Sequence, residues 1–213
     1  MTRGPDGRST DVLAGSGAPT WLASMLNHCS RCGGRLVHGP VAGEDRDRLA
    51  CIDCGHVAYL NPRLVVTAIP VTADGEVILI RRGFEPGRGL WAQPGGFLEI
   101  DETPTEGAIR ETLEETGWDI ELDCLLCVQQ WRHAESGRQF VRFTFGAVPV
   151  RHHADRALDD GILRALWLTR DEIAAESARL RSPMVLASVD DWLAGHRLPL
   201  DAIRWLPSET ASA

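Results

Sequence analysis

Apolar runs alternate with turn-forming residues along most of the chain after residue 62. Short apolar or alternating runs predict strands over residues 65–71, 77–80, 120–131, 140–150 and 165–168. Within the fourth run, Val141, Phe143 and Phe145 recur at the period of two that places side chains on one face of a strand. The first two runs flank Asp74-Gly75, a dipeptide typical of a type I′ turn, so they are predicted to form a hairpin.

Helix boundaries are marked by capping residues at two places. Thr103-Pro104-Thr105-Glu106 combines a capping box with proline at the first helical position, and Gly117 ends the pattern, which predicts a helix over 104–116. A second capping box at Thr169–Glu172 opens another helix, and a third is predicted over 183–194. Strands and helices mix without strict alternation, so we expect an α+β fold, an α/β/α sandwich with a mixed sheet.

Composition limits the classes of function. The 213 residues allow one ordinary domain of about 100–150 residues and a small accessory module. A formal net charge of -8 argues against a nucleic-acid partner, because an acidic surface repels polyanions; an anionic substrate would need cations at its site. The sequence contains no apolar run of about 18 residues and no secretory signal, so we expect a cytoplasmic protein without a membrane partner.

Two cysteine pairs have the spacing of a structural zinc site. Cys29 and Cys32 are separated by eighteen residues from Cys51 and Cys54, and a glycine follows each pair. Four thiolates would close the tetrahedral sphere of Zn²⁺ and stabilise a segment too small for its own core. The alternative is that the cysteines are reduced and pack as small apolar residues. Cys124-x2-Cys127 has the same spacing but lies in a predicted strand, where residues three apart face opposite sides, so we interpret it as core packing.

The predicted helix over 104–116 carries a cluster of acidic residues. Glu111, Glu114 and Glu115 are three and four residues apart, so their carboxylates project from one side of the helix. Such carboxylates repel one another unless cations neutralise them, and their oxygens suit Mg²⁺ or Mn²⁺. Arg110 is placed to make a bidentate pair with a carboxylate, for which Glu102 is the candidate. Gly95 allows close approach of the backbone, so its carbonyl is a candidate further ligand.

These residues resemble the Nudix box. The match is Gly96-x5-Glu102-x7-Arg110-Glu111-Thr112-x-Glu114-Glu115-x-Gly117-Trp118, with Thr112 standing where the family usually has a larger aliphatic residue. The resemblance implies a sandwich fold, divalent-metal dependence, catalysis by the charged residues of the box, and hydrolysis of nucleoside diphosphates linked to another group. It divides the chain into a flexible tail (1–24), a zinc ribbon (25–62), a Nudix hydrolase domain (63–197) and a C-terminal tail (198–213). A short helix is expected over Trp21–Leu26.

The order of zinc ribbon, apolar strand and Nudix box is similar to that of NADH pyrophosphatases and of ADP-ribose/FAD pyrophosphatases. The NADH group typically carries a Ser-Gln-Pro-Trp-Pro-Phe-Pro-like stretch after the box, whereas this chain has Cys127-Val-Gln-Gln-Trp-Arg-His133. The stretch Gly89–Glu99, together with Cys51–Pro62, is closer to the ADP-ribose/FAD group. The resemblance therefore favours ADP-ribose or FAD, and because a homodimer is common in similar pyrophosphatases, it makes a homodimer the assembly to test.

Several alternatives stay open. The chain could be an NADH pyrophosphatase, could remove oxidised nucleoside triphosphates, or could bind a nucleotide as a sensor without cleaving it, although a sensor has no need of several hard ligands. The general base is either one of the box glutamates or a loop carboxylate, for which the candidates are Glu135, Asp155, Asp159 and Asp160. Trp131 is a candidate to stack on a base, but packing within a strand is the commoner fate of a tryptophan.

Overall fold

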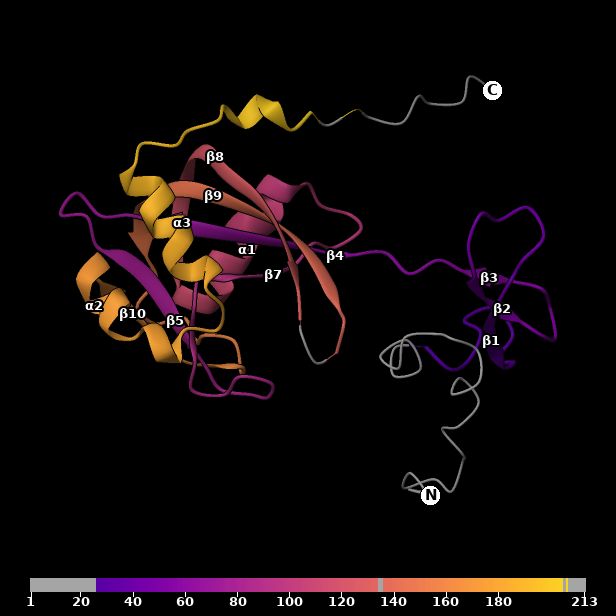
Figure 1. The fold of residues 1–213 in the computed structure, drawn as a ribbon. Helices are drawn as coiled ribbons and strands as arrows, with labels where there is room; N and C mark the ends of the chain where they lie inside the picture. Colours follow the sequence, from indigo (N-terminus) through magenta and orange to yellow (C-terminus); the bar gives the residue numbers. More distant parts are fainter. Residues whose placement is uncertain (1–25, 134–135, 205, 207–213) are drawn as a thin grey trace, which may run out of the picture. The chain divides into compact units, whose positions relative to one another are not determined.

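A computed structural model describes residues 26–133, 136–204 and 206 (Figure 1). The chain divides into two compact units, Met1–Pro62 with Arg132–Gln139 and Arg63–Trp131 with Phe140–Ala213. The expected tail over 1–24 and all but the last residue of the expected helix over Trp21–Leu26 lie outside the described residues. No helix of the described residues is long and apolar enough to cross a membrane.

The smaller unit contains a three-stranded antiparallel sheet. Its strands pair in the order β1 (Leu36–Gly39), β2 (Arg48–Cys51), β3 (Val57–Ala58). Two cysteines belong to its few buried side chains, which are Cys29, Leu36, Leu49 and Cys51. A core of this size supplies little hydrophobic stabilisation, so the unit needs another source of folding energy.

The larger unit contains two sheets. Its strands are β4 (Arg63–Pro70), β5 (Val77–Arg82), β6 (Trp91–Ala92), β7 (Gly95–Phe97), β8 (Trp118–Arg132), β9 (Gln139–His152) and β10 (Ile162–Leu168). One sheet has the order β7-β4-β9-β8 and the other β10-β5-β6. Because β4 pairs in parallel with β9 and antiparallel with β7, the four-stranded sheet is mixed, as the sequence predicted.

Three α-helices and two short 3₁₀ helices complete this unit. They are α1 (Pro104–Thr116), α2 (Arg170–Ala175), η3 (Ser177–Arg179), α3 (Met184–Leu193) and η4 (Leu200–Ala202). The Thr103 side chain caps α1 and the Glu106 side chain bonds back to the cap, while Gly117 ends the helix at φ 73°. Thr169 and Glu172 form the second predicted capping box at the start of α2.

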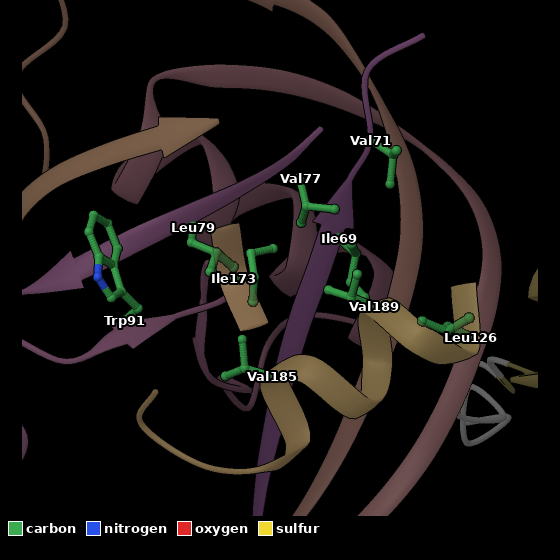
Figure 2. Close-up of a cluster of buried hydrophobic side chains, with 9 residues drawn as sticks. All are labelled: Ile69, Val71, Val77, Leu79, Trp91, Leu126, Ile173, Val185 and Val189. Carbon is green, nitrogen blue, oxygen red and sulfur yellow. The ribbon is translucent and has the colours of Figure 1, made fainter. Parts of the chain in front are cut away.

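The side chains of β4 point alternately to two hydrophobic layers. Val66 packs in a cluster with Ala108 of α1. Ile69 lies in a cluster with Val185 and Val189 of α3, which Figure 2 shows converging from the strands and the helix. Full burial of such aliphatic side chains is worth about 1.5–3 kcal/mol each. The sheet is therefore held between α1 on one face and α3 on the other, the expected α/β/α arrangement.

The strand pairing predicted around Asp74-Gly75 was wrong. β4 and β5 enter different sheets and meet beside the turn, where Val71 forms an antiparallel bridge with Val77 and the Thr72 N–H donates to the Glu76 carbonyl at 2.9 Å. A type I′ turn needs positive φ at both central residues, whereas here only Gly75 has it, at 84°. At the start of the segment predicted as a C-terminal tail, Leu198 exchanges backbone hydrogen bonds of 2.9 and 3.0 Å with Leu125.

Candidate active site and metal centre

The four predicted zinc ligands come together in the smaller unit. All four sulfur atoms lie within 4.8 Å of one another, and none forms a disulfide. The Cys32 Sγ is 3.5 Å from the Cys51 Sγ and 3.3 Å from the Cys54 Sγ. The backbone N–H of Arg31 donates to the Cys29 Sγ at 3.3 Å, a contact that stabilises a thiolate. This donor set fits a tetrahedral Zn²⁺ ion.

The other cysteine pair packs in the core, as predicted, but its two side chains do not lie on opposite faces of the strand as expected. Cys124 lies beside Trp192 of α3, and Cys127 packs against the hydrophobic cluster that contains Val185 and Val189 of the same helix. Residues 124–126 are all buried, so the regular alternation of β8 is interrupted there. Burial raises the pKa of both thiols, which disfavours thiolate chemistry.

Arg110 holds the loop before α1 against the helix. Its Nε donates to Glu102 Oε2 at 2.9 Å and its Nη2 to Glu102 Oε1 at 2.7 Å, a bidentate pair. The Glu99 N–H also donates to Glu102, at 2.9 Å. These donors hold the pKa of Glu102 below its usual value, chiefly through Arg110, so Glu102 stays ionised as a fixed support.

The same guanidinium reaches two further carboxylates. Its Nη1 donates to Glu111 Oε1 and to Glu114 Oε2, each at 2.9 Å. The second oxygen of each carboxylate has no hydrogen bond from the described residues. Burial raises the pKa of Glu111 despite the pairing with Arg110, so this carboxylate remains short of neutralising charge.

Glu115 is the most buried carboxylate of the cluster. It is 8% exposed, and its Oε2 accepts a hydrogen bond of 2.7 Å from the backbone N–H of Gly95. Burial raises its pKa to about 8, and the negative charges of Glu111 and Asp159 act in the same direction. A buried carboxylate that resists ionisation is stabilised when a cation binds to it.

Gly95 and Gly96 leave room for these carboxylates. Gly95 has φ 150° and pairs with Thr67 of β4, whose methyl carbon would lie 2.6 Å from an added Cβ. A Cβ on Gly96 would lie 2.6 Å from the Glu111 carboxyl carbon. Any larger residue would push the carboxylate or the strand away, so the glycines allow β7 to approach both α1 and β4.

The carboxylate oxygens of the acidic residues suit a divalent cation chemically, but they do not lie around a single point in this structure. Among the described residues, only the cysteines form a group of three or more ligand residues whose atoms lie so close together. Arg110 lies between Glu111 and Glu114 and occupies part of the space that a cation would need. The donors are nevertheless hard oxygens, partly buried and repelling one another, which is the set that Mg²⁺ or Mn²⁺ prefers.

Two charged residues lie near the cluster: Asp159, which the sequence analysis named only as one of four candidate loop bases, and Arg82, which it did not name. The Asp159 N–H donates to the carbonyl of Glu114 at 3.1 Å, and its carboxylate acts on the pKa values of Glu111 and Glu115. Arg82, at the end of β5, is half-buried and its charge acts on Glu115. Periodicity gave no signal for either, because both reach the helix through tertiary packing.

The other residues predicted as a general base or as a residue that stacks on a nucleotide base lie away from the acidic cluster or outside the described residues. Asp155 and Asp160 are exposed on the loop between β9 and β10, and Glu135 is not described. Trp131 stacks on Phe140 with ring centroids 5.6 Å apart, so it is packed against the neighbouring strand. None of these residues joins the acidic cluster by a contact in the described part of the chain.

Comparisons with known proteins match both parts of the chain to known families. A family model described as the NUDIX domain matches residues 61–189, and one described as Nudix N-terminal matches residues 27–60. The phosphatase NudJ of Escherichia coli (strain K12) is 34% identical over 139 residues, which are 65% of this chain and 89% of that protein.

Solved structures are similar as well. A NUDIX hydrolase from Nitrosomonas europaea has 35% identity and a TM-score of 0.66, over 68% of this chain and 98% of that chain. A UDP-X diphosphatase has 26% identity and a TM-score of 0.54, over 66% of this chain and 67% of that chain.

Proposed function

This chain belongs to the Nudix hydrolase family, and we propose that it uses Mg²⁺ or Mn²⁺ to hydrolyse the diphosphate bond of a nucleoside diphosphate linked to a second group. The observation that carries the proposal is the buried Glu115, with its raised pKa, beside Glu111 and Glu114 on one helix. Burying a carboxylate without a cation lowers the stability of the fold, and a metal site would explain why such a carboxylate is present.

Glu111, Glu114 and Glu115 would hold the metal, with the Gly95 carbonyl as a further ligand. A bound divalent ion would neutralise the diphosphate and lower the pKa of a water molecule that attacks phosphorus. Arg110 would position Glu111 and Glu114 while Glu102 fixes the guanidinium. Loss of this support would misplace the carboxylates rather than remove them.

The general base would be a carboxylate of the same cluster. A base works best with a pKa near the working pH, and Glu115 has a raised pKa with its Oε1 free of hydrogen bonds from the described residues. Asp159 is the loop alternative, because the hydrogen bond from its N–H to Glu114 keeps it near the C-terminal half of α1. If Glu115 bound the metal with both of its oxygens, Asp159 would be the general base.

The substrate that the sequence favours is ADP-ribose or FAD, giving AMP and a phosphorylated product. The similarity to a UDP-X diphosphatase supports the general class of a nucleotide joined to a second group. The similarity to a protein named a phosphatase favours a second candidate, removal of a terminal phosphate from a small phosphorylated molecule. The two reactions differ in their products, since only the second releases inorganic phosphate directly. Four free thiols at a zinc site also suit a reducing compartment, and we propose the cytoplasm.

The test is Mg²⁺-dependent hydrolysis of ADP-ribose, FAD, NADH, nucleoside-diphosphate sugars and 8-oxo-dGTP, with products separated by chromatography. E114Q and E115Q should greatly reduce turnover while the protein remains folded by circular dichroism, and E121Q, at an exposed glutamate of β8, should not.

AMP release from ADP-ribose or FAD supports the proposal, and direct phosphate release favours the second candidate. Turnover by E115Q at the wild-type rate would contradict the assignment of the site. Binding without hydrolysis across the panel would favour the sensor alternative.

A further inference from the structure

Arg142 of β9 is a buried cation without a carboxylate partner. It is 7% exposed, and no acidic side chain of the described residues lies within ion-pair distance of it. Its Nη2 donates to the Gln129 Oε1 at 2.6 Å and, at 3.0 Å each, to the Met184 carbonyl and the Ser188 hydroxyl. Its Nε is buried and finds no hydrogen-bond partner in the described part of the chain. Burial lowers the pKa of Arg142 to about 10, so the side chain is charged at neutral pH while some of its donors stay unsatisfied.

Gln93 brings a second unsatisfied atom to the same turn of α3. It is 3% exposed, and its Oε1 is buried without a hydrogen-bond partner among the described residues. Its Nε2 lies 3.5 Å from the Val185 carbonyl, which follows the Met184 carbonyl that Arg142 contacts. Because an arginine Nε only donates and an amide oxygen only accepts, the two atoms together match a ligand group that carries an acceptor next to a donor.

The face of the sheet around Arg142 carries aromatic side chains. Val65 of β4 pairs with Arg142 on one side and with Phe97 of β7 on the other, so these three side chains share one face, which is the face that α3 packs on. Phe97 is 47% exposed. Two residues before Arg142, Phe140 has the same orientation on β9 and stacks on Trp131. Aromatic rings beside buried polar atoms suit a flat heterocycle, which stacks on the rings and bonds through its edge.

A short segment of chain connects this polar pair to the acidic cluster. Gly95 follows Gln93 by two residues, and its N–H donates to the Glu115 Oε2 at 2.7 Å. Two residues of chain span at most about 7 Å, and β7 forms the edge of its sheet. A nucleotide whose phosphates lie near Glu115 would therefore run along this edge and reach Gln93 with its base.

The geometry points to Arg142 and Gln93 as the residues that bind the heterocyclic base of the substrate, with Arg142 donating to a ring acceptor and Gln93 accepting from the adjacent N–H or amino group. This inference rests on the proposed function, because it names the side chains that recognise the nucleoside. Adenine offers a ring nitrogen beside its amino group, and uracil offers a carbonyl beside its ring N–H, so the ligand class is a purine or pyrimidine base. A buried water molecule would also satisfy both protein atoms, and the test separates the two explanations.

The test is saturation-transfer NMR of adenosine and uridine with the full-length protein in buffer without divalent ions, and ribose is the probe that has no base. The unmodified protein should bind at least one nucleoside through its base protons and should bind ribose much more weakly. Q93M should weaken nucleoside binding about three- to tenfold, which is the loss of one hydrogen bond. Its unfolding midpoint in urea should be retained or raised, because methionine fills the same space without an unsatisfied oxygen.

Two further variants complete the experiment. Q130M is the matched control, since Gln130 is exposed on the opposite face of β8 from Gln129 and the change is identical; it should leave binding unchanged. R142K keeps the positive charge but loses the Nε donor, so it should also weaken nucleoside binding. If circular dichroism shows that R142K does not fold, Q93M decides the question.

Three outcomes would overturn the inference: no nucleoside binding by the unmodified protein, unchanged binding by Q93M, or an equal loss in Q130M. If Gln93 and Arg142 only enclosed a water molecule, Q93M would leave nucleoside binding unchanged. Because nucleosides have no phosphate and the measurement needs neither metal nor turnover, failure of hydrolysis in the substrate panel would count against the proposed function and not against this site.

Discussion

Replacing Glu115 by glutamine tests whether one buried carboxylate limits the stability of the metal-free protein. Burial, reinforced by the charge of Glu111, raises the pKa of Glu115 from 4.5 to about 8. The folded state therefore holds this proton more tightly than the unfolded state. Stability contributed by the protonated form is complete below pH 4.5 and is lost as pH rises through about 8.

The size of the effect follows from the pKa. Each pKa unit is worth about 1.4 kcal/mol, so between pH 5.5 and pH 9 the wild-type protein should lose about 3 kcal/mol of unfolding free energy through Glu115. Glutamine has no proton to lose and keeps an oxygen to accept the hydrogen bond from Gly95. E115Q should match the wild type at pH 5.5 and exceed it by about 3 kcal/mol at pH 9.

The assay is urea unfolding at both pH values in buffer without divalent ions, followed by the fluorescence of tryptophans such as Trp91, Trp118 and Trp192. E121Q serves as the control and should follow the wild type. Added Mg²⁺ should then stabilise the wild type at pH 9 more than E115Q, because the ionised carboxylate is the form that a cation binds. If E115Q and the wild type lose stability in parallel between the two pH values, the reasoning about Glu115 is wrong.

Three further predictions concern the metal sites and their support. Metal analysis of untagged protein should find about one zinc per chain, and the C32S variant should contain less. Absence of zinc from the wild-type protein would contradict the predicted zinc site. R110K keeps the charge but loses the bidentate pair, so kcat should fall about 10–100-fold with the fold retained, and full activity would exclude a positioning role. G96A should weaken activation by Mg²⁺ because its Cβ would lie 2.6 Å from the Glu111 carboxyl carbon, whereas G39A, which meets nothing within 4 Å, should not. Equal Mg²⁺ dependence in both variants would contradict that view.

The helix that carries the acidic residues was predictable to its ends because its signals are local. Thr103, Glu106 and Gly117 each act on backbone groups within a few residues, and α1 spans the predicted Pro104–Thr116. The four cysteines were predictable for a similar reason, since each knuckle is a short turn closed by glycine.

Strand partners were less predictable because pairing depends on residues far apart in the sequence. β7, which is not among the strands predicted from the sequence, is only three residues long and forms because Gly95 and Gly96 pair with β4. Likewise, nothing local reveals that β4, which precedes the Asp74-Gly75 turn, pairs in parallel with β9. A short strand next to a central one is stabilised by its neighbour rather than by its own composition.

The candidate site also combines residues that local spacing predicts with residues that only tertiary packing brings together. Helical spacing places Glu111, Glu114 and Glu115 on one side of α1, but it does not reveal that Arg110 bonds with two of them at once. Nor does spacing bring Asp159 to the cluster, because Asp159 lies on the loop between β9 and β10 and meets α1 through the hydrogen bond from its N–H to the Glu114 carbonyl. Sequence reasoning therefore named the candidate ligands, Arg110 and Asp159, but it did not place Asp159 or Arg82 beside the acidic cluster.

The balance of those charges bears on how a substrate could enter. Around α1, the carboxylates of Glu102, Glu111, Glu114, Glu115 and Asp159 face the guanidinium groups of Arg110 and Arg82. With Glu115 mostly protonated at neutral pH, the other four carboxylates still outnumber the two guanidinium groups, so a diphosphate would be repelled from the metal-free site. A divalent cation would displace the Glu115 proton and offset most of the excess negative charge. Metal binding would then have to precede or accompany substrate binding, so the metal would be needed for substrate binding as well as for the chemical step.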